Sequence, residues 1–211
     1  MRIKTILAAT FAALILMSCV TPFDYSAFKE SRPRSILVMP PVNKTVDVSA
    51  PMPFLVTSTV PLAESGYYVI PVTMSSQTFI QNGITIADEA HLLPHARLRQ
   101  IFGADAALYI TVLEYGSIMG RVYVIAEGKL VNLRTGVELW NAKIRAEEDG
   151  ALRTSGFGLI GALATVAVNQ IVNVLTDKAY DVGKKANNML LSADTHNGIL
   201  YGPYHPKYDG E

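Results

Sequence analysis

The sequence AALYITVLEY, at residues 106–115, is apolar except for Thr111 and Glu114. Short apolar runs rich in β-branched and aromatic residues are typical of strands that are covered on both faces. Before this run, Gly103 ends a shorter amphipathic pattern that begins at Pro94. We therefore expect a helix over residues 94–102, followed by the central strand of a sheet.

A β-hairpin is predicted after this strand. Its two strands are Arg121–Asn132 and Val137–Glu147, and the residues between them are Leu133-Arg134-Thr135-Gly136. A turn that ends in glycine between two apolar segments favours a hairpin. Four apolar residues of the first strand tend to alternate, namely Val122, Val124, Ala126 and Leu130. In the second strand, Trp140 can face either the core or a partner, and its size favours the core.

Two further segments with strand character lie in the first half of the chain. Ser35–Pro41 is apolar and ends in two prolines, and Tyr67–Val72 is aromatic and β-branched with Pro71 near its end, which favours a sheet edge. Between them, Met52–Ser65 shows a rough helical pattern that Gly66 would end. The residues that carry this pattern are Phe54, Leu55, Val60, Leu62 and Ala63. Residues 73–83 are expected to form either a loop or a short helix.

The run Thr154–Thr176 contains no charged residue. Its length would suit a membrane span, but glycines crowd its start and Asn169, Gln170 and Asn173 occupy its second half. We interpret it as a buried helix that continues into an amphipathic one, Asn169–Leu191. Its small and apolar residues predict close contact with a second subunit, and the expected contact residues are Leu159, Gly161, Leu163 and Val166.

The N-terminus has the pattern of a signal peptide. Arg2 and Lys4 precede an uncharged apolar segment that ends in Leu16-Met17-Ser18-Cys19. This ending resembles the lipobox of bacterial lipoproteins, in which cleavage leaves a lipidated cysteine as the first residue. Cys19 is the only cysteine in the sequence, so it cannot form an internal disulfide. We therefore expect residues 1–18 to be a lipoprotein signal peptide and Cys19 to be lipidated.

Composition limits the remaining chain. Residues 19–33 mix proline, serine and isolated charges with Phe23, Tyr25 and Phe28, and are expected to form a lipidated tether that can dock loosely. Residues 34–211 suffice for one domain with a C-terminal helix and a docked tail. The chain has 18 basic and 18 acidic residues, so it lacks the basic excess of a nucleic-acid-binding protein. Apolar residues make up 50% and charged residues 17%, which favours an additional buried interface.

No motif predicts catalysis or a cofactor. Residues Gly156-Phe157-Gly158-Leu159-Ile160-Gly161 match the dinucleotide fingerprint, but a polar segment precedes them and no crossover to a parallel strand follows. A packing or hinge role fits better. His91 and His95 have the spacing of metal ligands on a helix, but Pro94 is expected to begin the helix and to leave His91 outside it. We expect no catalytic residue, no cofactor and no metal site.

Several segments together resemble a known family: Leu16–Cys19, Ile36–Pro41, Gly66–Pro71, Gly103–Tyr115, Thr135–Trp140 and Gly198–Pro206. The chain is similar, over nearly its full length, to a lipoprotein family of unknown function that includes a meningococcal surface-antigen candidate. That family is similar in fold to the amino-terminal domain of TolB, to the curli-secretion lipoprotein and to lipoproteins that activate penicillin-binding proteins. The resemblance implies an α/β fold with a mixed β-sheet flanked by helices.

Two functional hypotheses follow. The first is a non-enzymatic lipoprotein, anchored in the outer membrane and facing the periplasm, that forms homo-oligomers and serves envelope assembly, transport or secretion; exposure at the cell surface stays open. Val20 supports this location, because retention at the inner membrane calls for aspartate after the cysteine. The alternative is an activator that docks on a peptidoglycan synthase. An enzyme would need a polar pocket that gathers His91, His95 or the acidic residues 147–149.

Replacing Cys19 by serine tests the lipid anchor. We expect Cys19→Ser to leave a slower-migrating precursor at the inner membrane, because the modifying enzymes require the thiol. Metabolic labelling with a palmitate analogue measures the modification. Incorporation of label into the serine variant would contradict the assignment.

Overall fold

The computed structural model describes residues 23–118, 121–148, 150–155, 177–193 and 198–208. The expected signal peptide, Cys19 and most of the uncharged run lie outside these ranges. The described elements, in chain order, are α2 (Ser26–Ser31), β1 (Ser35–Val38), β2 (Val42–Asn43), α3 (Met52–Thr57), α4 (Thr59–Glu64), β3 (Tyr68–Val69), α5 (Val72–Gln81), α6 (Ala87–His91), α7 (His95–Phe102), β4 (Ala106–Ile118), β5 (Arg121–Asn132), β6 (Glu138–Glu147), β7 (Gly150–Ser155) and α9 (Asp177–Leu191).

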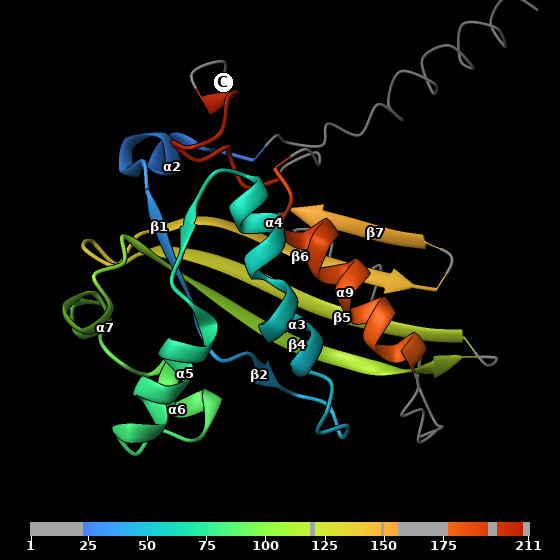
Figure 1. Ribbon diagram of the computed structural model, residues 1–211. Coiled ribbons are helices and arrows are strands. Elements are labelled where there is room, and N and C mark those ends of the chain that lie inside the picture. The colour runs from blue at the N-terminus through green and yellow to red at the C-terminus, as the bar shows by residue number, and fades with distance from the viewer. Residues whose placement is uncertain (1–22, 119–120, 149, 156–176, 194–197, 209–211) are drawn as a thin grey trace, which may run out of the picture.

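The strands form one mixed sheet with the order β3-β1-β4-β5-β6-β7, and β2 pairs with β4 beside β1. The pairs that involve β1, β2 and β3 are parallel, and β4 to β7 are antiparallel. Helices flank this sheet, as Figure 1 shows. The α/β class and the mixed sheet expected from the sequence are thus confirmed.

The apolar run at residues 106–115 forms most of β4, which pairs with both β1 and β5. Residues 106–110 are all buried, including the side chains of Leu108 and Ile110. Alternate residues of β4 face two different apolar clusters, so both faces of its first half are covered. The predicted central strand is confirmed.

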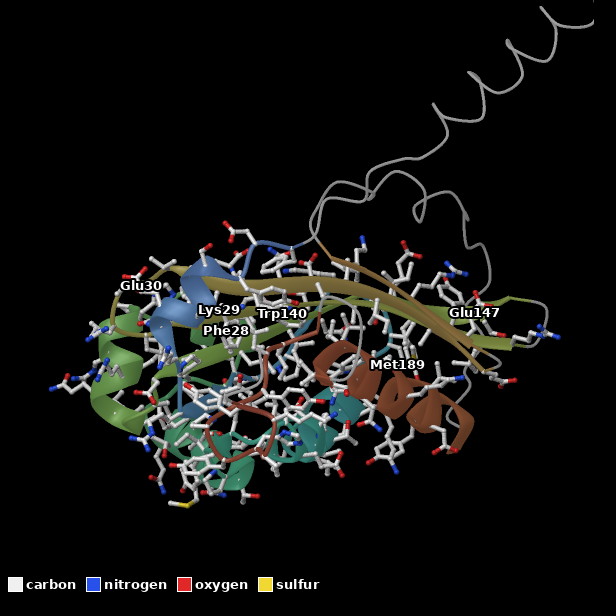
Figure 2. All side chains as sticks on the ribbon, turned by 90° about the horizontal axis from the view of Figure 1, so that it is seen from above. Phe28, Lys29, Glu30, Trp140, Glu147 and Met189 are labelled. Carbon is white, nitrogen blue, oxygen red and sulfur yellow. The ribbon has the colours of Figure 1, made fainter. Side chains whose placement is uncertain are left out.

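The larger cluster lies between the sheet and the helices α3, α4 and α9. Trp140, on β6, is fully buried in it, which agrees with the expected core position. Figure 2 shows Phe28, Trp140 and Met189 on the same side of the sheet as α9. The smaller cluster lies on the other face, where Phe79 of α5 and Leu98 of α7 cover the first residues of β4.

Helices α3 and α4 meet at Ser58 because Pro61 has no N–H to offer the carbonyl of Thr57. The polar groups at this break are buried against α9. Asn187, which is fully buried, donates its side-chain amide to Phe54 O at 3.2 Å, to Thr57 Oγ1 at 2.7 Å and to Ser58 Oγ at 3.2 Å. The hydroxyl of Ser58 also donates to Phe54 O. We call Thr57, Ser58 and Asn187 the polar node.

Gly183 allows α9 to lie close to α3 beside this node. A Cβ at position 183 would stand 2.7 Å from Cβ of Pro53, which is closer than real side chains pack. Glycine in a helix interior is unfavourable by about 1 kcal/mol relative to alanine. Close contact between the two helices accounts for its presence here.

Two segments differ from what the sequence suggests. Residues 26–31, placed in the tether by their composition, form α2, and Phe28 is 3% exposed in the larger cluster. Ser31 Oγ of this helix accepts a hydrogen bond of 2.6 Å from Asn132 Nδ2. In β5, burial alternates less than expected, because Tyr123 and Ile125 are buried as well as Val122 and Val124.

The C-terminal segment lies against the loop after α4. Gly202 N donates to Ser65 O at 2.7 Å, and Tyr204 N donates to Gly66 O at 3.1 Å. Ile199 and Tyr201 are buried. Among the described residues, no helix combines the length and apolar character needed to cross a bilayer.

The predicted hairpin between β5 and β6 is confirmed, and its turn is held by Asn132. Asn132 Oδ1 accepts hydrogen bonds from the backbone N–H groups of Arg134 and Thr135, at 2.7 and 3.0 Å. Gly136 has φ +74°, and its N–H donates to Asn132 O at 2.8 Å. Only glycine adopts this backbone conformation at little cost.

We expect Gly136→Val to lower the free energy of unfolding by about 1 kcal/mol or more, because a β-branched residue is strained at positive φ. A Cβ would also stand 3.2 Å from His95 Nδ1. Chemical denaturation measures the change. Gly136→Asn is the control, since asparagine tolerates this conformation better and should lose less stability. Equal midpoints for wild type and the valine variant would contradict the turn assignment.

Candidate functional site

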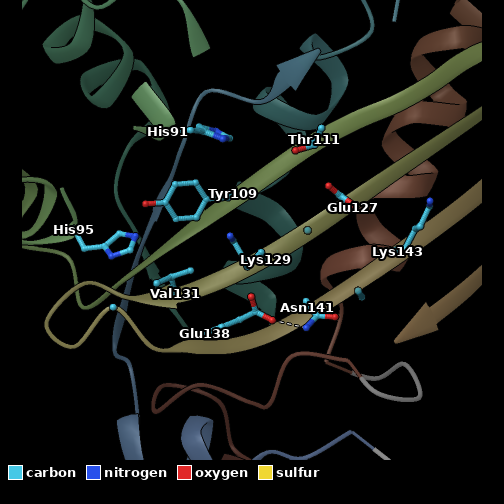
Figure 3. A pocket seen from close by; sticks show the side chains of 13 residues that line it. His91, His95, Tyr109, Thr111, Glu127, Lys129, Val131, Glu138, Asn141 and Lys143 are labelled. Carbon is cyan, nitrogen blue, oxygen red and sulfur yellow. Dashed lines mark hydrogen bonds between the residues drawn. The ribbon is translucent and has the colours of Figure 1, made fainter. Parts of the chain in front are cut away.

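A cavity of about 290 Å³ opens on the sheet face opposite α9, where α6 and α7 border strands β4, β5 and β6. We call it the sheet pocket. Its side chains come from α6, α7, β4, β5 and β6, and Figure 3 shows how they lie around the cavity. The polar and aromatic lining residues are His91, His95, Tyr109, Thr111, Glu127, Lys129, Glu138, Asn141 and Lys143.

Tyr109 forms the inner wall of the sheet pocket between the two histidines. Its ring centroid lies 4.9 Å from that of His91 and 6.2 Å from that of His95, both edge-on. The side chain is 7% exposed, and its hydroxyl has no hydrogen-bond partner among the described residues. Burial raises the pKa of Tyr109 to about 12, so the hydroxyl stays protonated at neutral pH. An unpaired buried hydroxyl costs about 1–3 kcal/mol, so a polar group bound there would be stabilised.

His91 is fixed by the loop after β1. Its Nε2 lies 2.9 Å from Pro40 O, and because a carbonyl only accepts, Nε2 carries the proton and Nδ1 is the acceptor in the neutral ring. Burial is the main cause that lowers the pKa of His91 below its ordinary value of 6.5, and it outweighs the opposing effects of Pro40 O and Asp88. The ring is therefore neutral at pH 7.

The rim of the sheet pocket carries both signs of charge. Lys129 Nζ lies 5.7 Å from the centroid of the Tyr109 ring. Glu127 stands opposite Lys143 in the β5–β6 register. Asn141 Nδ2 donates to Glu138 Oε1 at 2.5 Å. The lining thus offers both donors and acceptors, which suits a small polar molecule.

The lining contains no serine or cysteine that could act as a nucleophile beside a histidine. Within the described ranges, no three His, Cys, Asp or Glu side chains are grouped so as to hold a metal ion. The pocket can bind and orient polar groups, and these residues show no assembled catalytic set.

The structure brings together some of the residues singled out in the sequence. His91 and His95 lie on different helices, α6 and α7, as Pro94 predicted, yet both contact Tyr109. The acidic residues 147–148 lie apart from the pocket at the end of β6, where Glu147 Oε1 accepts from Arg145 Nε at 2.9 Å. The expected contact residues Leu159, Gly161, Leu163 and Val166, and the glycines 156 and 158, lie outside the described residues.

Sequence reasoning missed the role of the sheet residues in this pocket. The feature of the sequence that could have revealed this role is the register of the predicted hairpin. It places Lys129 opposite Asn141 and Glu127 opposite Lys143 on one face of the sheet. Polar residues at such positions mark a face that the core does not cover.

A second surface lies on the outside of α3 and α4. Met52, Val56 and Val60 follow one another at four-residue spacing and are 56%, 45% and 54% exposed. Val46 and Val48, in the preceding loop, are still more exposed. We call Met52, Val56 and Val60 the α3–α4 stripe. Val60 is one of the residues that carry the helical pattern predicted for Met52–Ser65, and helical periodicity, which continues across the break at Ser58, turns it outward.

Comparison with known proteins identifies the class. The family described as "Putative lipoprotein GNA1162-like" matches residues 23–204, so the chain belongs to this lipoprotein family. It is 45% identical over 208 residues to the "Putative lipoprotein NMB1124/NMB1162" of Neisseria meningitidis serogroup B, with 95% of this chain and 96% of that protein covered.

The chain is also similar to solved structures. The crystal structure of lipoprotein GNA1162 from Neisseria meningitidis has a TM-score of 0.52 and 43% identity, covering 62% of this chain and 92% of that one. The PelC dodecamer from Paraburkholderia phytofirmans scores 0.38 at 14% identity, covering 81% and 90%. The C-terminal domain of LpoB from Salmonella enterica scores 0.38 at 16% identity, covering 67% and 92%.

The lowered pKa of His91 predicts a pH dependence of stability. The unfolded chain binds this proton near pH 6.5, whereas the folded protein binds it only at lower pH. The contribution of neutral His91 to the free energy of unfolding is therefore complete above pH 6.5. It is lost as the pH falls from 6.5 toward the pKa of His91 in the folded protein. Denaturation midpoints at pH 7.5 and 5.5 should differ more for wild type than for His91→Gln. Equal differences would show that the ring is not buried as a neutral group.

Proposed function

We propose that this lipoprotein is anchored by lipid on Cys19 in the outer membrane, faces the periplasm and forms homo-oligomers as a non-enzymatic accessory of envelope assembly or transport. Membership of a lipoprotein family and the lipobox-like residues Leu16–Cys19 support the anchor. The domain division proposed from the sequence goes with it: a signal peptide at residues 1–18 and a periplasmic domain after the anchor.

The α3–α4 stripe is the observation that carries self-association. Residues 48–63, which contain α3 and most of α4, include no charged side chain. In a twofold dimer the same surface meets itself, so a charge near the twofold axis would lie close to its own copy. A surface without charge avoids that repulsion, and a second copy of this chain therefore fits it.

Burial of the stripe would stabilise a dimer. Full burial of a valine or methionine side chain contributes about 1.5–3 kcal/mol, and here about half of each is already buried. The three residues, counted on both copies, would contribute several kcal/mol before association costs of at least about 4 kcal/mol. The expected contact through Leu159, Gly161, Leu163 and Val166 would add to this surface and remains part of the proposal.

The alternative function is an activator that docks on a peptidoglycan synthase. In that case the stripe would contact a synthase domain, and the lipoprotein itself would be a monomer. Oligomeric state therefore separates the two functions.

Val56→Asp tests the proposal in the full-length lipidated protein in nonionic detergent. We expect wild type to sediment as a dimer or larger, and the variant to associate about tenfold more weakly or worse, because a carboxylate would be buried in the interface. The matched control is Ile80→Asp, which places the same charge on exposed α5. It should not change the sedimentation.

Circular dichroism checks that both variants are folded. A wild-type protein that is monomeric at every concentration would contradict self-association. If that monomer binds a purified synthase domain and Val56→Asp abolishes the binding, the activator function is the correct one.

A further inference from the structure

A cavity of about 190 Å³ lies between α2 and the C-terminal segment, at the same end of the molecule as the first described residue. We call it the α2–tail cavity. Its walls include Phe28, Lys29 and Arg32 from α2 and its end, and Tyr67, Tyr201 and Tyr208. The charged lining residues, Lys29 and Arg32, are both basic. The cavity therefore combines positive charge with aromatic walls.

A third cation lies beside this cavity. Lys207 Nζ is 3.2 Å from Tyr201 Oη and 5.2 Å from the centroid of the Tyr201 ring. Tyr67 donates its hydroxyl hydrogen to Leu200 O, which ties the wall to the tail. The basic side chains thus come from two sides of the cavity: Lys29 and Arg32 from α2 and its end, and Lys207 from the C-terminal segment.

Arg32 has an unfavourable backbone conformation. Its φ is 42° and its ψ is 58°, and it is the one non-glycine residue with positive φ in the described part of the chain. Its N–H donates to Phe28 O at 2.9 Å and its Nε donates to Lys29 O at 3.2 Å. Glycine would satisfy the same helix end without strain. Strain of this kind is characteristic of functional positions, and here it places a guanidinium at the cavity.

The membrane is close to this end of the domain if Cys19 carries the lipid anchor, and the inference rests on that part of the proposed function. Phe23 packs against the larger cluster. The chain from Cys19 to Phe23 spans at most about 14 Å when fully extended. The surface around α2 therefore has to lie near the lipid headgroups.

We propose that the α2–tail cavity binds the headgroup phosphate of an anionic phospholipid in the membrane that holds the anchor. Arginine and lysine are the side chains that bind phosphate most strongly, arginine through paired N–H groups. Tyrosine suits the boundary between headgroup and acyl chain, because its ring is apolar and its hydroxyl is polar. A bound headgroup would fix the orientation of the domain on the membrane, which a flexible anchor alone does not.

The test is a titration of the full-length lipidated protein, in nonionic detergent, with the short-chain lipid dihexanoyl phosphatidylglycerol, followed by native mass spectrometry. Dihexanoyl phosphatidylcholine and inorganic phosphate are the comparison ligands. We expect phosphatidylglycerol to bind several-fold more tightly than phosphatidylcholine, because the charged residues among the described lining are Lys29 and Arg32, which are both basic. Phosphate alone at about tenfold excess should not displace the lipid, since it makes no apolar contacts.

Arg32→Gly is the decisive variant, because glycine keeps the backbone conformation and removes only the guanidinium. It should bind phosphatidylglycerol about tenfold more weakly or worse, with no fall in the denaturation midpoint. Arg97→Gln, on exposed α7, removes the same charge elsewhere and should bind as wild type does.

Equal binding by Arg32→Gly, equal affinity for phosphatidylcholine, or displacement by inorganic phosphate would each overturn the proposal. A wrong assignment of the lipid anchor can be told apart from a wrong assignment of the cavity. In the first case Cys19 carries no palmitate label, while the titration still measures lipid binding at the cavity. Failure of self-association appears in sedimentation and leaves lipid binding unchanged.

Discussion

The buried amide of Asn187 links α9 to α3 and α4 within the helical layer that covers the sheet. Pro61 interrupts the helix that carries the α3–α4 stripe, and the break leaves polar groups at Phe54, Thr57 and Ser58 inside the core. Buried polar groups have to be paired, since each unsatisfied one costs about 1–3 kcal/mol. Asn187 donates hydrogen bonds to them from α9, which favours the observed rotation of α3 and α4. That rotation buries Phe54 and Leu62 and turns Val56 and Val60 outward.

The three surfaces follow from this arrangement. The helices α3, α4 and α9 cover one face of the sheet. The sheet pocket lies on the other face, over β4, β5 and β6. The outer side of the same helical layer is the stripe proposed for self-association. The α2–tail cavity lies at the N-terminal end, near the proposed anchor. An accessory lipoprotein would thus present its membrane, partner and ligand contacts on separate surfaces of one domain.

The sequence was most informative where local chemistry determines structure. Residues 106–115 could only be a covered strand, and the turn ending in Gly136 required a hairpin. Pro94 and Gly103 set the ends of α7 correctly. The pattern over Met52–Ser65 did not tell that Val60 faces outward, because apolar character alone does not tell which side of a broken helix docks.

Other features depend on contacts between distant residues and could not be predicted. Asn187 lies about 130 positions from the groups that it pairs, so nothing near it in the sequence reveals its role. The meeting of His91 and His95 at Tyr109 likewise depends on how α6 and α7 pack on β4. The sequence predicted a tether that can dock loosely around Phe28, but not the helix α2 or the full burial of this side chain against the core. The expected interface at Leu159, Gly161, Leu163 and Val166 stays a prediction.

The free energies of unfolding of Asn187→Leu and Asn188→Leu test most directly whether the polar node holds the helices in place. Both variants make the same substitution at neighbouring positions of α9, but Asn187 is buried and Asn188 is exposed. Asn187→Leu should lose about 1–3 kcal/mol, because it removes the buried hydrogen bonds that join α9 to α3 and α4, whereas Asn188→Leu should stay within about 0.5 kcal/mol of wild type. Equal stabilities of the two variants would contradict the central role of Asn187.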